Sequence, residues 1–207
     1  MNERAQGLGE EIANAASHGI GFVLALAALP VLASSGESAA RPNTGLVVFI
    51  ASMLLVYLAS ALYHGLPDGR AKWIWKRVDH AAIFVFIAGS CTPFALRIND
   101  GATTLTVVWA LAAVGAALKL LELLNHRVAS TGVYVVFGWL ALAAIGPASG
   151  QIAREALLLI LAGGAAYSVG TLFYLLDDRV RYGHAVWHLF VLGGSACHFA
   201  AAVQQAT

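Results

Sequence analysis

Residues 45–66 read GLVVFIASMLLVYLASALYHGL, a run of 22 residues without an aspartate, glutamate, lysine or arginine. A helix rises about 1.5 Å per residue, so a run of this length covers the roughly 30 Å of hydrocarbon in a bilayer. Backbone polar groups in lipid must bond to one another, which allows only a helix or a closed barrel. Barrel strands are nearer 10 residues long and alternate in polarity, unlike this run. The stretch therefore predicts a transmembrane helix.

Similar apolar runs recur along the chain, separated by short polar interruptions. We expect seven spanning helices, near residues 14–34, 45–66, 78–96, 103–121, 131–148, 154–176 and 183–203. The connections between them, such as Ser34–Thr44 and Leu66–Arg77, are too short to hold a separate domain. The sequence thus predicts an all-α integral membrane protein, with residues 1–207 forming one bundle of seven transmembrane helices.

The composition supports lipid as the solvent of most side chains. Only 11% of the residues are charged, whereas soluble domains average roughly 25%. A formal net charge of +1 offers no electrostatic argument for a nucleic-acid partner. Glu3, Glu10 and Glu11 precede the first apolar run, where a secretory signal would be basic, so we expect no cleaved leader.

Lysines and arginines indicate the orientation of the bundle. With the N-terminus placed in the cytoplasm, nine of the twelve fall on the cytoplasmic side, and only Arg41, Arg97 and Arg154 fall on the other. Cytoplasmic loops of membrane proteins are enriched in these residues. We therefore expect a cytoplasmic N-terminus and an outside C-terminus.

Strongly polar side chains within a membrane cost several kcal/mol unless they are partnered, so their positions are informative. Here they gather near the cytoplasmic ends of four predicted helices, about 3–12 Å below the interface at 1.5 Å per residue. The residues of this layer are Glu10, Glu11, Asn14, His18, Ser60, His64, Asp79, His80, His184 and His188.

The histidines of this layer suggest a metal site. His184 and His188 are four residues apart, which places both imidazoles on one helix face, and His64 is expected at the same depth. Zinc accepts three histidine ligands with a water in the open position. Asp79 is suited to orient that water or to act as its general base, and Ser60 lies one turn before His64, where it can support a ligand or substrate.

Simpler interpretations exist for several of these residues. His184 could face lipid headgroups at the interface, and Asp79 could form a boundary ion pair with Arg77 or Lys76. Glu10 is best explained as a carboxylate that complements the positive end of the first helix.

The remaining polar residues divide by helix face and by depth. Glu11 and Asn14 share a face with His18, which favours a joint role near the site. His80 is more typical of a side chain that bonds a neighbouring helix. His198 lies ten residues beyond His188, about 15 Å deeper, so we interpret it as a packing histidine bonded to another helix.

Four of these motifs together resemble a known family. Glu11–His18 is similar to the E-x-x-N-x-x-[ST]-H opening of the hemolysin III group within the progestin and adipoQ receptor (PAQR) family. Ser60–His64 matches its S-x-x-x-H element, Asp79 its third-helix aspartate, and His184–His188 its H-x-x-x-H. The order and helix assignment agree over nearly the whole chain, and the short N-terminus fits the bacterial branch.

The resemblance implies specific roles. In the wider superfamily, which includes adiponectin receptors and alkaline ceramidases, three histidines bind zinc, and an aspartate and a serine belong to the site. Carried over by position, His64, His184 and His188 become the zinc ligands, with Asp79 near the water and Ser60 in support. The other polar residues of the layer would surround this centre: Glu11, Asn14, His18 and His80.

Three functions are compatible with these features. The first is a zinc-dependent, ceramidase-like hydrolase that acts on a lipid amide or ester in the inner leaflet of a bacterial cytoplasmic membrane, with membrane lipids as its partners. The second is a receptor or membrane-homeostasis protein with structural zinc. The third is a pore-forming haemolysin, which is disfavoured because the outer halves of the helices are nearly all apolar.

Overall fold

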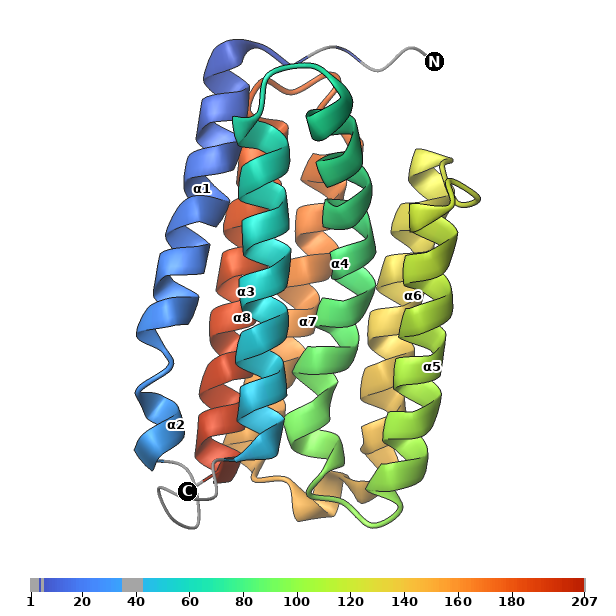
Figure 1. The fold of residues 1–207 in the computed structure, drawn as a ribbon. Helices are drawn as coiled ribbons and strands as arrows, with labels where there is room; N and C mark the ends of the chain where they lie inside the picture. Colours follow the sequence, from blue (N-terminus) through green and yellow to red (C-terminus); the bar gives the residue numbers. More distant parts are fainter. Residues whose placement is uncertain (1–3, 5, 35–42, 207) are drawn as a thin grey trace.

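The computed structural model describes residue 4 and residues 6–34 and 43–206, and every regular element in these ranges is helical. The elements are α1 (Leu8–Ala27), α2 (Val31–Ser34), α3 (Thr44–Gly65), α4 (Arg70–Ala95), α5 (Gly101–Leu120), α6 (Arg127–Ile145), the 3₁₀ turn η1 (Gly146–Gln151), α7 (Arg154–Leu175) and α8 (Gly183–Ala206). The seven long helices run alongside one another as an up-and-down bundle, and α1 begins at the end opposite to that where α8 finishes (Figure 1).

Length and composition qualify six of these helices, α3 to α8, as membrane spans. The seventh long helix, α1, has a polar side that faces the bundle. Its buried residues recur every three or four positions, and they begin with Glu10, Asn14 and His18. An all-α membrane protein of seven long helices is therefore confirmed, and α1 differs from the others because it brings polar groups into the interior.

The first predicted span is divided in the structure. One helix was expected over residues 14–34, but α1 begins at Leu8 and ends at Ala27, and the short α2 follows. Pro30 lies in the turn between them, where its missing N–H and fixed φ oppose a continuous helix. The predicted connection Ser34–Thr44, including Arg41, falls largely on residues 35–42, outside the described residues.

The third predicted span also begins earlier than expected. Its helix, α4, starts at Arg70 rather than near residue 78, so the basic segment before Asp79 is helical and not a loop. Lysine and arginine are good helix formers, so the helix continues through the basic segment. The apolar run indicated where the helix enters lipid and not where the helix itself begins. The remaining predicted spans agree with the observed helices to within a few residues.

Close approach of α3 and α4 depends on glycine. A Cβ at Gly45 would lie 2.6 Å from the Cα atom of Pro93, and one at Gly89 would lie 2.2 Å from Ser52 Oγ. Small residues let helices in membranes approach closely enough for van der Waals packing. The pair α7 and α8 packs in the same manner, whereas α5 and α6 stand at one side of the bundle (Figure 1).

We expect Gly45→Ala to destabilise the protein. The new methyl group would clash with the Cα atom of Pro93, and a backbone atom cannot move aside as the end of a flexible side chain can. The expected loss is about 1–3 kcal/mol of unfolding free energy, measured as a lower midpoint of thermal unfolding in detergent.

Gly132→Ala in α6 is the matched control, because a Cβ there meets nothing within 4 Å. Alanine is the better helix former, so this control should unfold at the same temperature as the wild type or above it. Equal midpoints for the two variants would contradict the observed α3–α4 contact.

Candidate metal centre

Three histidines from two helices meet at the end of the bundle where α1 begins. His64 closes α3, and His184 and His188 lie in the first two turns of α8. One ligand atom from each lies within 4.8 Å of the others. The ring centroids are 4.8 Å apart for His64 and His184, 5.3 Å for His64 and His188, and 4.7 Å for the α8 pair. The predicted convergence of these histidines is confirmed.

Two of the imidazoles are oriented by carboxylates. His64 Nδ1 lies 2.7 Å from Glu11 Oε2, and His184 Nδ1 lies 2.8 Å from Asp177 Oδ2. An ionised carboxylate only accepts hydrogen bonds, so each Nδ1 is the donor and each Nε2 keeps its lone pair. His64 Nε2 is buried and has no hydrogen-bond partner within the described ranges.

The third imidazole is oriented by α1. His188 Nδ1 lies 3.2 Å from the carbonyl oxygen of Asn14 and 2.9 Å from Ser17 Oγ. Ser17 donates its own hydroxyl proton to Asn14 O, so the serine oxygen is available as an acceptor. The carbonyl also only accepts, which again makes Nδ1 the donor and leaves Nε2 as a ligand atom.

Cations hold the two orienting carboxylates. Lys72 Nζ lies 2.8 Å from the second oxygen of Glu11, and Arg127 bonds the second oxygen of Asp177. Burial alone would raise the pKa of Asp177, but the hydrogen bond from His184 and the hydrogen bond and positive charge of Arg127 outweigh it and lower that pKa. Asp177 is thus held as an acceptor for the His184 ring.

This donor set fits a metal ion. Each imidazole has Nδ1 committed, and Nε2 bonds no group in the described part of the chain. Three such rings form a ligand set typical of zinc and related divalent ions. A tetrahedral ion with bonds of about 2.0–2.1 Å would hold the nitrogens about 3.3 Å apart. Because the ligand atoms already lie within 4.8 Å of one another, each pair needs to approach by at most about 1.5 Å. The buried cluster could therefore bind a metal ion.

Asp79 and Ser60 lie beside the cluster and not within it. Both are buried, with 8% and 0% of their surface exposed, and both line the same cavity as His184 and His188. Among the described residues, the group of converging ligand atoms contains the three histidines alone. Arg77, one of the two cations considered above as a partner of Asp79, stacks on Trp73 with its guanidinium carbon 4.4 Å from the ring centroid.

The remaining predicted residues surround the centre. The His18 ring stacks on His188 with centroids 3.5 Å apart and planes 11° apart. Asn14 is fully buried and donates its side-chain amide to Gln6, 2.6 Å away. His80 lines the cavity, and its backbone carbonyl accepts a bond from Tyr134.

Glu10 has a larger structural role than helix-end complementation alone. Its carboxylate accepts the N–H of Gly7, 3.0 Å away, which caps the first turn of α1 as expected. It also binds Arg4 and the backbone N–H of Tyr182. The start of α1 is thereby tied to the segment that precedes the α8 ligands.

Sequence reasoning missed Asp177, Arg127, Lys72 and Ser17 as members of the site. Asp177 lies seven residues before His184, a spacing that neither a helix nor a strand would bring into contact. The turn between α7 and α8 folds the carboxylate back onto the ring. Acidic residues and arginines at the membrane interface are common in membrane proteins, so nothing in the sequence marked Asp177 and Arg127 as partners.

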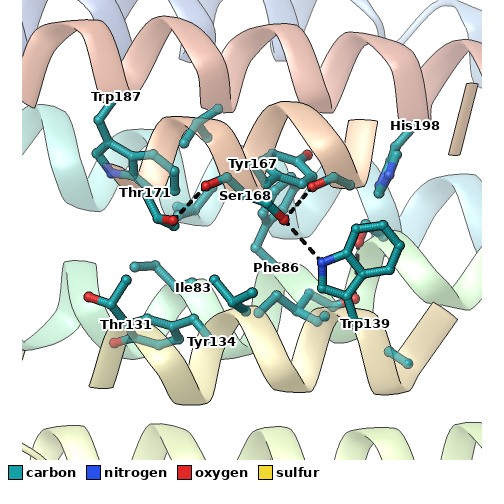
Figure 2. Close-up of a pocket in the computed structure, with 18 of the residues that line it drawn as sticks. Ile83, Phe86, Thr131, Tyr134, Trp139, Tyr167, Ser168, Thr171, Trp187 and His198 are labelled. Carbon is teal, nitrogen blue, oxygen red and sulfur yellow. Dashed lines mark hydrogen bonds between the residues drawn. The ribbon is translucent and has the colours of Figure 1, made fainter. Parts of the chain in front are cut away.

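A long cavity extends from the histidines into the bundle. Residues of α1, α3, α4, α6, α7 and α8 line it, and most of them are apolar. Figure 2 shows its wall, with Trp187 and Thr171 toward one end and Trp139 and His198 toward the other. Ten residues of helix separate His188 from His198, which corresponds to about 15 Å along the axis.

The fold and the cluster define this chain as a multi-span helical membrane protein with a buried three-histidine centre that could bind a metal ion. Residues 6–199 match the family described as haemolysin-III related, and the chain belongs to that family.

Several relatives are similar over most or part of the chain. The Hemolysin-3 homolog of Bacillus subtilis is 40% identical over 195 residues, which cover 92% of this chain and 91% of that protein. Hemolysin-3 of Bacillus cereus is 40% identical over 204 residues, or 96% and 93% of the two chains. The human monocyte to macrophage differentiation factor is 26% identical over 124 residues, or 58% and 51%.

We expect Asp177→Asn to weaken metal binding, because the neutral amide is a poorer acceptor for His184 Nδ1 and a poorer partner for Arg127. Loss of such an orienting carboxylate typically reduces metal affinity by about 10–100-fold. The affinity is measured by competition with a chromophoric zinc chelator in detergent.

Asp178→Asn is the control, because it removes the same charge one residue further along the turn. The control should retain the affinity of the wild type. If both variants bind zinc as tightly as the wild type, Asp177 does not orient the ligand.

Proposed function

We propose that the protein is a zinc-dependent hydrolase that cleaves a lipid amide or ester at the cytoplasmic leaflet of a bacterial inner membrane. The observation that carries the proposal is the arrangement of the three imidazoles. Each has Nδ1 committed as a donor to another group, so each Nε2 is available to a single ion at the head of a mainly apolar cavity. A metal site joined to such a cavity suits a substrate with a polar carbonyl and a long hydrocarbon part.

The orientation is part of the same proposal. Lysine and arginine concentrate at the end of the bundle where α1 begins, which the positive-inside rule places in the cytoplasm. The histidine cluster lies at that end, just inside the predicted interface. A lipid of the inner leaflet would therefore meet the site with its linkage to the headgroup, while its chain enters the cavity.

The protein groups beside the ion have complementary roles in hydrolysis. When bound, zinc supplies Lewis-acid chemistry that lowers the pKa of a coordinated water toward about 7 and polarises a carbonyl. Asp79 accepts the proton of the attacking water and passes it to the leaving amine or alcohol as a general acid–base group. Ser60 donates its hydroxyl to the carbonyl oxygen as negative charge develops there.

The number of ligands favours a catalytic ion over a structural one. Structural zinc is almost always held by four protein ligands, whereas catalytic zinc has three and an open position. Within the described residues the cluster provides three histidines, and Asp79 lies outside it. The cavity reaches His184 and His188, where a substrate needs access.

Purified protein should contain about one zinc per chain, and His184→Ala or His188→Ala should lose it, because two ligands hold the ion far more weakly than three. The thermal midpoint should fall when zinc is removed by chelation, since metal binding is coupled to folding. His126→Ala, at the exposed N-cap of α6, is the control and should keep its zinc. Metal analysis that finds full zinc in both ligand variants would disprove this assignment.

Substitution of Asp79 separates catalysis from metal binding. Asp79→Asn should retain zinc yet lose about 10²–10⁴-fold in turnover, because the amide cannot accept the proton. The assay is release of fatty acid from ceramide or phospholipid in vesicles that contain the purified protein. Asp100→Asn, at the opposite end of the bundle from the cluster, serves as the control and should retain full turnover. Wild-type turnover in Asp79→Asn would exclude this residue as the base.

A further inference from the structure

His198 lies in the second half of α8, far from the metal centre but in the same cavity. Its ring projects from α8 toward the region of Trp139 (Figure 2). The Nε2 atom lies 3.0 Å from the carbonyl oxygen of Ile160 in α7, so the expected bond to another helix is confirmed. This bond uses only one of the two ring nitrogens.

The bond to Ile160 determines the chemistry of the other nitrogen. A carbonyl oxygen only accepts, so Nε2 must be the donor and carry the proton. In the neutral ring Nδ1 is then an acceptor with a free lone pair. This atom is buried and has no hydrogen-bond partner among the residues that the structure describes. Ionisable side chains within membranes are usually retained for a function, so the open acceptor requires an explanation.

The protein builds a specific place for this ring. A Cβ at Gly163 would lie 2.3 Å from His198 Cδ2, so the glycine makes room for the imidazole. Tyr167 meets the ring edge to face, with centroids 5.3 Å apart and planes 88° apart. The ring is therefore held from α7 on two sides, with little freedom to turn Nδ1 elsewhere.

The neighbouring polar groups of the cavity wall are paired with one another. Trp139 Nε1 donates to Ser168 Oγ, 3.0 Å away, and Ser168 donates to the carbonyl of Gly164. Tyr167 and Ser195 share a hydrogen bond of 3.1 Å. These groups bond one another, whereas His198 Nδ1 accepts no hydrogen bond from any residue that the structure describes.

We propose that His198 Nδ1 accepts a hydrogen bond from the ligand of the cavity and forms a second polar subsite about 15 Å from the histidine cluster. The ligand class is a mainly apolar molecule with a hydrogen-bond donor, a hydroxyl or an amide N–H, in its hydrocarbon part. Because carbon–carbon bonds are about 1.5 Å long, a zigzag chain of about twelve carbons covers this distance. The inference rests on the proposed function only in that the cavity takes a lipid, and it does not require cleavage.

The experiment compares three fatty acids on zinc-loaded, full-length protein in nanodiscs, with binding measured by native mass spectrometry. The probes are 12-hydroxystearate, 3-hydroxystearate and stearate, whose carboxylates can all bind at the metal end. One net hydrogen bond corresponds to about a three- to tenfold gain in affinity. We expect the wild type to prefer 12-hydroxystearate over both other probes by about this factor.

Two variants test the role of Nδ1. In His198→Gln the amide N–H can reach the Nε2 position and bond Ile160 O, but the acceptor at the Nδ1 position is lost. In His198→Asn the side-chain oxygen can replace Nδ1, but the bond to Ile160 is lost. The preference for 12-hydroxystearate should disappear in His198→Gln and persist in His198→Asn, while stearate binds both variants as it binds the wild type.

The outcomes separate this inference from the proposed function. Binding of all three probes with equal affinity to the wild type, or an unchanged preference in His198→Gln, would overturn the His198 subsite and leave the hydrolase proposal intact. Failure of the wild type to bind any probe would overturn the subsite and also the lipid-binding role of the cavity. A shared preference in the wild type and His198→Asn, absent from His198→Gln, supports the subsite.

Discussion

The structure depends on one constraint: each imidazole of the histidine cluster must be oriented by a hydrogen-bond acceptor at its Nδ1 atom. At the cluster, Nδ1 of every ring is committed to an acceptor from another element. Glu11 and Asn14 of α1 serve two of the rings, and Asp177 of the turn after α7 serves the third. The cluster therefore exists only when α1, α3, α8 and this turn are assembled together.

The same constraint explains why α1 differs from the other long helices. Its buried side carries Glu10, Asn14 and His18, which would be costly to expose to lipid. At the bundle interface Glu10 bonds Arg4, Asn14 bonds Gln6, and the His18 ring stacks on that of His188. The helix is thus attached to the bundle by its polar side, and it orients the ligands rather than providing one.

The cations form an outer layer around this arrangement. Lys72 at the start of α4 and Arg127 at the start of α6 each hold an orienting carboxylate. Arg127 also connects the histidine cluster to a helix that lines the cavity, because α6 contributes Tyr134, Trp139 and Ile145 to its wall. A displacement of α6 would move Arg127 and thereby shift Asp177 and the His184 ring that Asp177 holds.

Much of the architecture and the convergence of the three histidines could be predicted from sequence, and the groups that orient these histidines could not. Uncharged runs of about 20 residues can satisfy their backbones in lipid only as helices, so the spans followed from length and polarity alone. The pair His184 and His188 was predictable because both residues share one helix, and His64 because the short connections bring its end of α3 to the same layer. The break at Pro30 and the early start of α4 were missed because the apolar pattern records contact with lipid and not the limits of the helix.

What the sequence determined by itself was the number of long helices, their apolar sides and the collection of polar residues at one end. What only the tertiary structure decided was which nitrogen of each imidazole is engaged and by which partner. Asp177 reaches His184 through a turn, and Ile160 reaches His198 across two helices, so neither contact has a periodic spacing in the sequence. Local patterns follow from the geometry of a single helix, whereas these hydrogen bonds arise from the way in which separate helices pack against one another.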